Sequence, residues 1–357
     1  MILNDIPRRR LASQRLIEPL PSALDVVRWL GPIQAQDYGA AKWAVGQRTR
    51  EASEADIDRL FDEGLILRTH VMRPTWHLVL PKDARWLLAL TGPKVRRQAA
   101  ARWRELGIDE AAVSRANTAF SRALSGGRHL TRAELGQVLS EAGLSPDGQR
   151  LPHFLLAAEL DCVIISGPRR GKQLTYASFE ERVGHSERPA AEAAGELAGR
   201  YFRSHGPAQL RDFVWWSGLT MAAARKAVSL AGLGHELIEG RGYWFDPEVA
   251  VPLEHATVGY LLANFDEYTI GYTDRSALVD AGLLFGPAHF AYGNILSNVV
   301  TLDGRVRGGW RRKAVGDRFQ VELRLLNTLG PLEMVAIEQA CTRLGRFLGR
   351  EVDLVVR

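Results

Sequence analysis

The fold is indicated most clearly by residues 131–176, TRAELGQVLSEAGLSPDGQRLPHFLLAAELDCVIISGPRRGKQLTY. Thr131 and Glu134 have the spacing of a helix capping box, and Gly143 offers that helix a stop. The elements predicted after it are a helix at 149–160, a strand at 162–166, a turn with three cations at 167–172 and a returning strand at 173–176. A helix, a turn, a second helix and a basic-tipped hairpin are typical of a winged helix.

The same order of elements is predicted twice more. Before this stretch, a short helix at 53–61 precedes a hairpin at 65–80 that Arg73-Pro74 interrupts. After it, helices at 208–216 and 220–231 precede a short hairpin at 236–245. Units spaced by roughly 80 residues are too far apart for a solenoid and indicate a tandem array.

Beyond residue 252 the pattern changes from helices to strands. A connecting helix is expected over 186–198, and Asp303-Gly304 marks a hairpin turn between alternating runs. The strands are predicted at 258–262, 268–272, 298–302, 305–310 and 318–325, followed by a final helix at 332–348. We therefore predict an α+β protein made of tandem winged-helix units and a small C-terminal β-unit, barrel-like or open. Its predicted segments are 1–125 (first winged-helix unit), 126–185 (second), 186–251 (connecting helix and third) and 252–357 (β-unit with final helix).

The composition limits the classes of protein to which this chain can belong. The 357 residues are 46% hydrophobic and carry a net charge of +5, with a sequence pI of about 9.3, a basic excess that permits nucleic-acid binding without requiring it. No apolar run approaches the roughly 20 residues of a membrane span, and no secretory signal is recognisable. Cys162 and Cys341 lie far apart without metal-ligand spacing, so we expect a cytoplasmic protein without a disulfide framework or a metal site.

The candidate for chemistry is residues 31–38, GPIQAQDY. Pro32 prevents a helical ladder, and in an extended segment Gln34 and Gln36 lie on one side, where their amides can hold a water and line a developing positive charge. The alternative is that the two glutamines cap a turn. Asp37 points to the opposite side of an extended segment and is expected to cap the next helix.

Three clusters are candidates for DNA contact. In each case the alternative is a solvated face or core packing. No phosphate-binding glycine loop, dinucleotide fingerprint or Cys/His cluster is present, so we expect no cofactor. The clusters are His70, Arg73, Trp76 and His77 in the first hairpin, Arg169, Arg170 and Lys172 at a wing tip, and Arg311 and Arg312 after Trp310.

Several motifs together resemble one family. They are QAQDY at 34–38, AKWA at 41–44, LRTHVMRPTWHLV at 67–79, NFDEY at 264–268 and GGWRR at 308–312. In this order, over nearly the whole chain, they resemble the AlkZ and YcaQ family of bacterial winged-helix DNA glycosylases. The resemblance implies tandem winged helices and a β-unit around a concave channel of DNA size.

The resemblance also implies excision of alkylated purines from double-stranded DNA, including the unhooking of interstrand crosslinks. The family's catalytic signature is Gln, an apolar residue, then Gln or Asp, and Gln34 and Gln36 match the Gln form of the AlkZ branch. The second position therefore lacks the carboxylate of the YcaQ branch, which favours a narrower substrate range. Lys42 is the only lysine near the motif, so a Schiff-base lyase step is not expected.

A second hypothesis is that the protein binds DNA but catalyses no reaction. A winged-helix regulator or lesion-binding protein without catalysis would bind duplex DNA and release no base. Regulators usually dimerise to read two half-sites, whereas three fused units give one chain a continuous surface, so we expect a monomer. The sequence does not identify the lesion.

Overall fold

The chain divides into two compact units. The computed structural model describes residues 6–184, 188–250, 257–279 and 297–357. The larger unit comprises Met1–Ile57, Gly195–Trp216 and Thr220–Arg357, and the smaller unit comprises Asp58–Ala194 and Ser217–Leu219. None of the helices in the described ranges is both long enough and apolar enough to cross a membrane.

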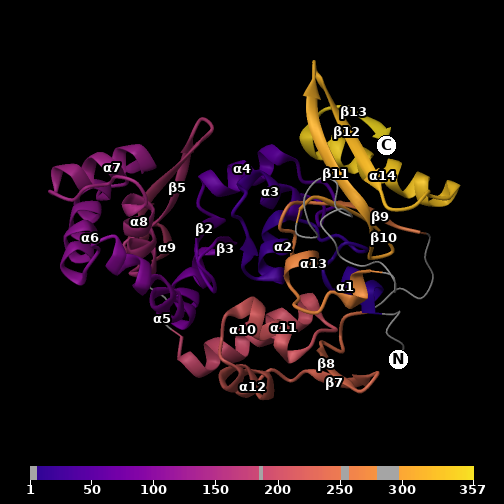
Figure 1. Cartoon of the computed structure of the whole chain (residues 1–357), viewed down its shortest axis with the longest axis horizontal. Coiled ribbons are helices and arrows are strands. Elements are labelled where there is room, and N and C mark those ends of the chain that lie inside the picture. The colour runs from indigo at the N-terminus through magenta and orange to yellow at the C-terminus, as the bar shows by residue number, and fades with distance from the viewer. Residues whose placement is uncertain (1–5, 185–187, 251–256, 280–296) are drawn as a thin grey trace. The chain divides into compact units, whose positions relative to one another are not determined.

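The smaller unit holds a helical bundle and two hairpins (Figure 1). Its helices are α5 (Pro81–Glu105), α6 (Glu110–Leu124), α7 (Arg132–Glu141), α8 (Arg150–Leu160) and α9 (Phe179–Val183), after α4 (Glu54–Asp62), which crosses the unit boundary. Its strands are β2 (Leu67–His70), β3 (Trp76–Val79), β4 (His129–Thr131), β5 (Ile164–Arg170) and β6 (Gln173–Ser178).

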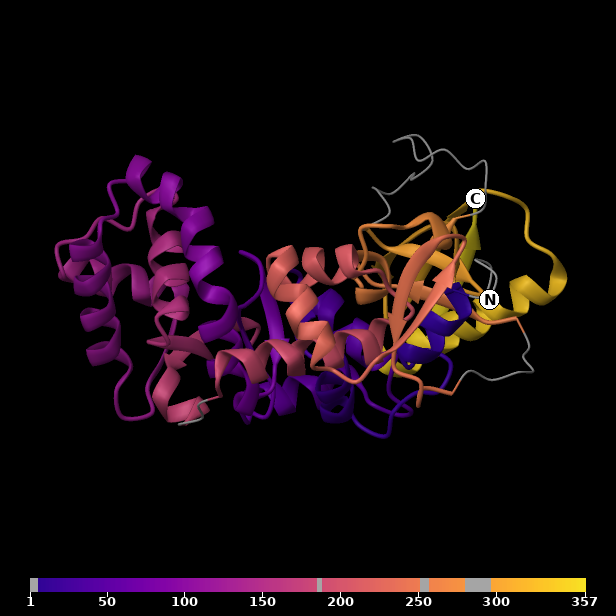
Figure 2. The ribbon, with the colours of Figure 1, turned by 90° about the horizontal axis from the view of Figure 1, so that it is seen from below.

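A continuous apolar core joins α5, α6, α7 and α8, which gather side by side (Figure 2). Phe120, Leu135 and Phe154 are fully buried in it, and burying each such side chain contributes about 1.5–3 kcal/mol. The predicted capping box is confirmed, since the Thr131 hydroxyl accepts from the Glu134 N–H and the Glu134 carboxylate accepts from the Thr131 N–H. The predicted helix–helix–hairpin order is present in α7, α8 and β5–β6, with β4 pairing on β6.

Two helices of this unit were not predicted. No element was assigned between residues 81 and 125, where α5 and α6 lie. Pro93 inside α5 reads as a helix breaker, but a proline costs a helix one hydrogen bond, and burial of the helix around it offsets that loss.

The larger unit combines helices with an open sheet. Its helices are α1 (Ile6–Ser13), α2 (Ala23–Leu30), α3 (Tyr38–Gly46), most of α10 (Ala190–His205), α11 (Leu210–Ser217), α12 (Met221–Ser229), α13 (Glu267–Ile270), the 3-10 turn Ser276–Leu278 and α14 (Pro331–Leu348). Its strands are β1 (Ile33–Gln34), β7 (Gly234–Ile238), β8 (Arg241–Phe245), β9 (Gly259–Leu262), β10 (Val299–Leu302), β11 (Arg305–Val315), β12 (Arg318–Leu325) and β13 (Val352–Val356). The predicted third helix–helix–hairpin set is present as α11, α12 and β7–β8.

Over residues 257–279 and 297–357, the C-terminal β-unit is an open sheet and not a closed barrel. Its strand order is β13-β12-β11-β10-β9, so β13 and β9 form its two edges. The predicted Asp-Gly turn joins β10 to β11, and Asp303 and Gly304 both have positive φ, as a two-residue hairpin turn requires. A side chain at position 304 would also collide with the Tyr268 hydroxyl, which fixes glycine there.

One predicted strand of this region is wrong. Residues 268–272 were expected to be extended, but the chain forms the short helix α13, which Asp266 caps by accepting from the Tyr268 N–H at 2.9 Å. Every residue from 267 to 272 is buried, so the spacing of apolar residues does not distinguish a helix, with its period of about 3.6 residues, from a strand, with its period of about 2. The expected connecting helix is α10; its predicted start at 186 and the predicted boundary between 251 and 252 lie outside the described residues.

Candidate active site

Residues 31–38 leave one helix and enter the next. Ser22 caps α2 at its start, and Gly31 ends it with a φ of 77°, a conformation that favours glycine. Pro32 cannot donate the next backbone hydrogen bond of a helix, and the chain becomes extended at β1. The extended conformation predicted for the first glutamine is therefore present.

Burial alternates along this segment. Ile33 and Ala35 are buried, whereas Gln34 is half-buried and Gln36 is exposed. Since successive side chains of an extended chain point to opposite sides, the buried pair faces the interior and the two amides face outward. Both carboxamides are therefore accessible, Gln34 from β1 and Gln36 from the bend that precedes α3.

The residues that follow the glutamine motif make structural contacts. Asp37 caps α3, accepting from the Ala40 N–H at 3.0 Å, as predicted. The Lys42 ammonium lies 2.9 Å from a Glu54 carboxylate oxygen and within 5.2 Å of the Tyr38 ring centre. The Lys42 side chain is therefore held in place by Glu54.

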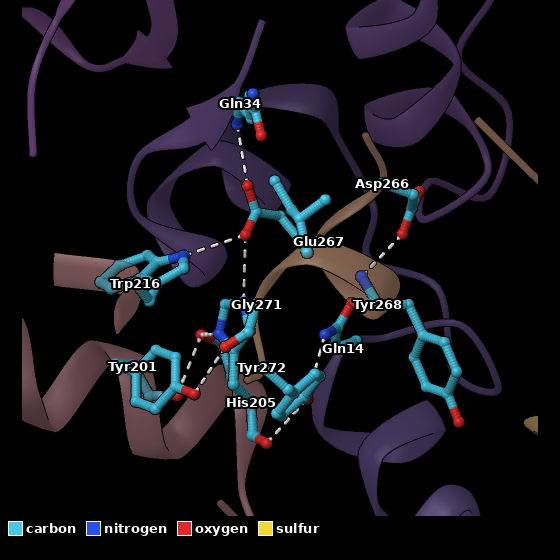
Figure 3. A network of polar contacts seen from close by, with 12 residues as sticks. Gln14, Gln34, Tyr201, His205, Trp216, Asp266, Glu267, Tyr268, Gly271 and Tyr272 are labelled. Atoms are coloured by element: carbon cyan, nitrogen blue, oxygen red, sulfur yellow. Dashed lines mark hydrogen bonds and ion pairs between the residues drawn. The ribbon is translucent and has the colours of Figure 1, made fainter. Parts of the chain in front are cut away.

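A buried carboxylate lies directly behind Gln34 (Figure 3). The Gln34 N–H donates to Glu267 Oε1 at 2.8 Å, and the Trp216 indole N–H donates to Glu267 Oε2 at 2.9 Å. His205 Nε2 lies 3.3 Å from the same Oε2. Only 1% of the Glu267 surface is exposed, so its charge is satisfied by protein groups from distant parts of the sequence.

His205 is the titratable partner in this cluster. Its complete burial lowers its pKa below the ordinary value of 6.5, although the Glu267 hydrogen bond acts in the opposite direction. The neutral ring can donate through Nε2–H to the carboxylate, and Nδ1 lies 2.8 Å from the Ser204 hydroxyl, which itself donates to the Arg200 carbonyl at 2.7 Å. The ring also stacks on Tyr201, with 4.7 Å between ring centres.

A buried ion pair supports the same turn. The Arg48 guanidinium donates to both oxygens of Asp266, at 2.7 and 2.9 Å, and both side chains are fully buried. Gln14 and Gln47 complete the cluster, because Gln14 accepts from Arg48 at 2.7 Å and Gln47 donates to Asp266 at 2.9 Å. Adjacent carboxylates at 266 and 267 thus anchor α13 to the turn after α3 and to α10, α11 and β1.

The first predicted DNA-contact cluster lies on the β2–β3 hairpin of the smaller unit. His70 and His77 are buried; His70 hydrogen-bonds to Glu159 and packs on Trp76, and His77 Nδ1 lies 2.9 Å from the Thr75 carbonyl. In this conformation the two imidazoles support the hairpin from inside. Arg73 and Trp76 are half-buried and remain the accessible members of the cluster.

The second cluster lies on the β5–β6 hairpin, and tertiary carboxylates hold two of its three cations. Arg169 pairs with Asp58 at 2.7 Å and with Asp62 at 2.8 Å. Burial acts to raise the pKa of Asp62, but the hydrogen bonds from Arg169 outweigh it and the pKa is lowered. Arg170 pairs with Glu134, whose pKa is lowered to about 2, first by the Thr131 backbone N–H and then by Arg170. Lys172 is exposed, with no ion-pair partner among the described residues.

The third cluster lies on β11 of the larger unit. Arg311 donates to the buried Glu322 carboxylate at 2.7 and 2.9 Å, yet 56% of its side chain is exposed. Arg312 is exposed and its guanidinium lies 5.2 Å from the Phe319 ring centre. Trp310 is buried, donating to the Leu262 carbonyl at 2.8 Å, so it anchors the strand that carries the two arginines.

Comparison with known proteins identifies the family. A family profile described as DNA glycosylase AlkZ-like matches residues 27–347. The chain belongs to the AlkZ-like DNA glycosylases. It is 29% identical over 320 residues to a protein of Streptomyces sahachiroi named interstrand DNA cross-link repair glycosylase, covering 83% of this chain and 84% of that protein. The solved structure of Streptomyces sahachiroi DNA glycosylase AlkZ matches with a TM-score of 0.76 and 24% identity, over 99% of this chain and 100% of that chain.

The family resemblance and the enzyme class predicted from sequence are therefore confirmed: the chain is a DNA glycosylase with a mixed α and β fold. What the sequence analysis missed in this AlkZ-like enzyme is the support behind the motif. Glu267 and Asp266 were noticed only as part of NFDEY, without roles. Two adjacent acidic residues flanked by Phe265 and Tyr268 were a usable signal, because carboxylates inside an apolar run are buried only when they are paired.

Proposed function

We propose that this AlkZ-like glycosylase hydrolyses the N-glycosidic bond of N7-alkylated guanine in duplex DNA and unhooks interstrand crosslinks made through that position. The name of the Streptomyces sahachiroi relative supports the crosslink substrate. The observation that carries the proposal is the accessible amide pair, Gln34 and Gln36, on either side of the buried Ala35. The pair offers hydrogen bonds and no carboxylate.

Such a site suits a leaving group that needs no proton. An N7-alkylated guanine already carries a positive charge, so the electrons of the C1′–N9 bond pass to the ring and neutralise it as the bond breaks. The sugar becomes an oxocarbenium-like cation, and a water adds to C1′ and loses a proton to solvent. The amide oxygens of Gln34 and Gln36 can accept hydrogen bonds from that water and line the positive charge, while their position supplies the orientation.

The glycosylase is proposed to be monofunctional. A lyase step needs an unprotonated amine that attacks C1′, and the ammonium of Lys42, the lysine nearest the motif in sequence, is held by Glu54. The products are then the free alkylguanine and an intact strand with an abasic site.

DNA binding is proposed to use the tandem helix–helix–hairpin sets as winged helices in a concave channel, with the segments 1–125, 126–185, 186–251 and 252–357 as successive units of a monomer. Phosphate contacts are proposed for the accessible cations on these hairpins, since neutralisation of phosphates by Lys and Arg supplies most of the non-specific affinity for DNA. The accessible part of the first hairpin is proposed to contact the duplex beside the lesion. The proposed contacts are Arg73, Trp76, Arg170, Lys172, Arg311 and Arg312, with His70, His77 and Arg169 supporting them.

The test uses a labelled duplex with one N7-methylguanine. Alkali after incubation converts abasic sites to strand breaks, and omitting alkali reports a lyase step. We expect breaks only with alkali, and at least about a 100-fold lower rate in Gln36→Ala and in Gln34→Ala. Unchanged rates in both variants would remove the pair from the mechanism, and breaks without alkali would contradict a monofunctional enzyme.

A further inference from the structure

Glu267 collects donors from three segments that are distant in sequence. It accepts from the Gln34 backbone N–H on one oxygen and from the Trp216 indole on the other, where His205 also contacts it (Figure 3). The residue separations from Glu267 are 233, 51 and 62. A carboxylate that is 99% buried and makes these contacts fixes the position of the Gln34 peptide group.

The groups that contact this carboxylate are hydrogen-bond donors. Backbone N–H and indole N–H groups can only donate, so they stabilise the charged form of the acid. His205 is neutral and donates to the same oxygen, and the neighbouring Asp266 takes the Arg48 guanidinium for itself. The carboxylate is thereby placed one backbone hydrogen bond from Gln34, whose side chain is proposed to face the reacting sugar.

We infer that Glu267 is a positioning residue of the glycosylase reaction: it holds the Gln34 peptide so that the Gln34 and Gln36 amides keep their outward orientation. The inference rests on the proposed role of the two glutamines. Glu267 touches neither substrate nor water in this account. Its effect is on orientation and should appear in the rate of bond cleavage at saturating enzyme, with duplex affinity unchanged.

Glu267→Gln tests this, because a glutamine side chain has one acceptor oxygen where the carboxylate has two. It cannot accept from both the Gln34 N–H and the Trp216 indole, so one donor faces an NH₂ group. Adding Trp216→Phe removes that competing donor. In the double variant the amide oxygen can return to the Gln34 N–H, and the NH₂ group can donate to His205 Nε2 once the ring proton moves to Nδ1, which faces the Ser204 hydroxyl oxygen.

We expect Glu267→Gln to lower the single-turnover excision rate on N7-methylguanine about 10- to 100-fold, with duplex Kd within about twofold of the parent. The double variant should recover most of that loss. The matched control is Asp83→Asn, which neutralises another buried carboxylate that accepts from an indole, Trp86, at 3.0 Å on α5. That control should keep the parent rate.

The inference is wrong if Glu267→Gln excises at the parental rate, or if its loss of rate is matched by weaker duplex binding. It is also wrong if the Glu267→Gln, Trp216→Phe double variant is as slow as Glu267→Gln while Trp216→Phe alone is active. Failure of the catalytic proposal is seen separately, as activity that persists in Gln34→Ala and Gln36→Ala. A readout independent of activity is the Gln34 amide proton in NMR spectra, which should be shifted downfield and protected from exchange in the parent. An exposed, rapidly exchanging amide would contradict the geometry itself.

Discussion

At the scale of single residues, the site depends on pairs that are far apart in sequence. The extended conformation of the glutamine motif was predictable, because Gly31 and Pro32 act within a few residues of it. The Arg48–Asp266 pair, by contrast, joins side chains 218 residues apart, and no local pattern predicts which acid meets which base. The sequence therefore indicated the two glutamines, but not the carboxylate of Glu267 that contacts the Gln34 backbone.

Removing one partner of that pair should be costly. Arg48→Leu leaves the Asp266 carboxylate buried with its main cationic partner gone, and we expect a loss of about 3–5 kcal/mol in the free energy of unfolding. Chemical denaturation of the purified variant measures it. Arg102→Ala, which removes an exposed pair with Glu105, is the comparison and should change the unfolding midpoint little; equal losses in the two variants would contradict a structural role for the buried pair.

At the scale of elements, short-range signals worked where they act locally. The capping box of α7 and the Asp-Gly turn between β10 and β11 are both present, because each needs only a few neighbouring residues. The prediction of a strand at 268–272 was wrong because every residue there is buried, so the pattern of apolar residues shows neither a helical nor a strand repeat. The barrel-like reading failed because strand alternation says nothing of whether the first and last strands meet, and here β9 and β13 remain edges.

Substitutions on the β5–β6 hairpin can distinguish cations that stabilise the fold from cations that bind DNA. Lys172 is exposed and forms no ion pair with any residue that the structure describes, so Lys172→Ala should weaken duplex binding and reduce the slope of log K against log salt by about 1. Arg169 is held by Asp58 and Asp62, so Arg169→Ala should mainly lower the melting temperature and alter the slope less. Binding measured at several salt concentrations, with thermal unfolding in parallel, distinguishes them; a larger slope change for Arg169 would reverse the assignment.

At the scale of the whole molecule, the repeated order of helices and hairpins in the sequence was the most reliable basis for predicting the architecture. The three helix-and-hairpin sets could be read from the order of their patterns without knowing any contact. Their grouping into two units could not, since the larger unit collects segments from the start, middle and end of the chain. Such long-range assembly depends on the complementarity of buried faces, which one sequence does not reveal.

Buried histidine should make stability depend on pH. Burial lowers the folded-state pKa of His205, and burial followed by the nearby charge of Arg102 lowers that of His153. Below about pH 6.5 the unfolded chain binds protons at these positions that the folded protein does not, so the free energy of unfolding should fall as pH decreases. Urea unfolding at about pH 7.5 and about pH 5.5 measures the change. His205→Gln should flatten the dependence, and a dependence as steep as the parent's would exclude His205 as its source.

The most direct measurement is unhooking of a duplex that carries a single interstrand crosslink between guanine N7 positions. Strands are separated on a denaturing gel after a single-turnover reaction. We predict that the parent converts the crosslinked species to free strands bearing abasic sites, and that the Gln34→Ala, Gln36→Ala double variant binds the duplex but leaves it crosslinked. A parent that binds the duplex and leaves the crosslink intact would contradict the proposed substrate, and unhooking by the double variant would contradict the proposed site.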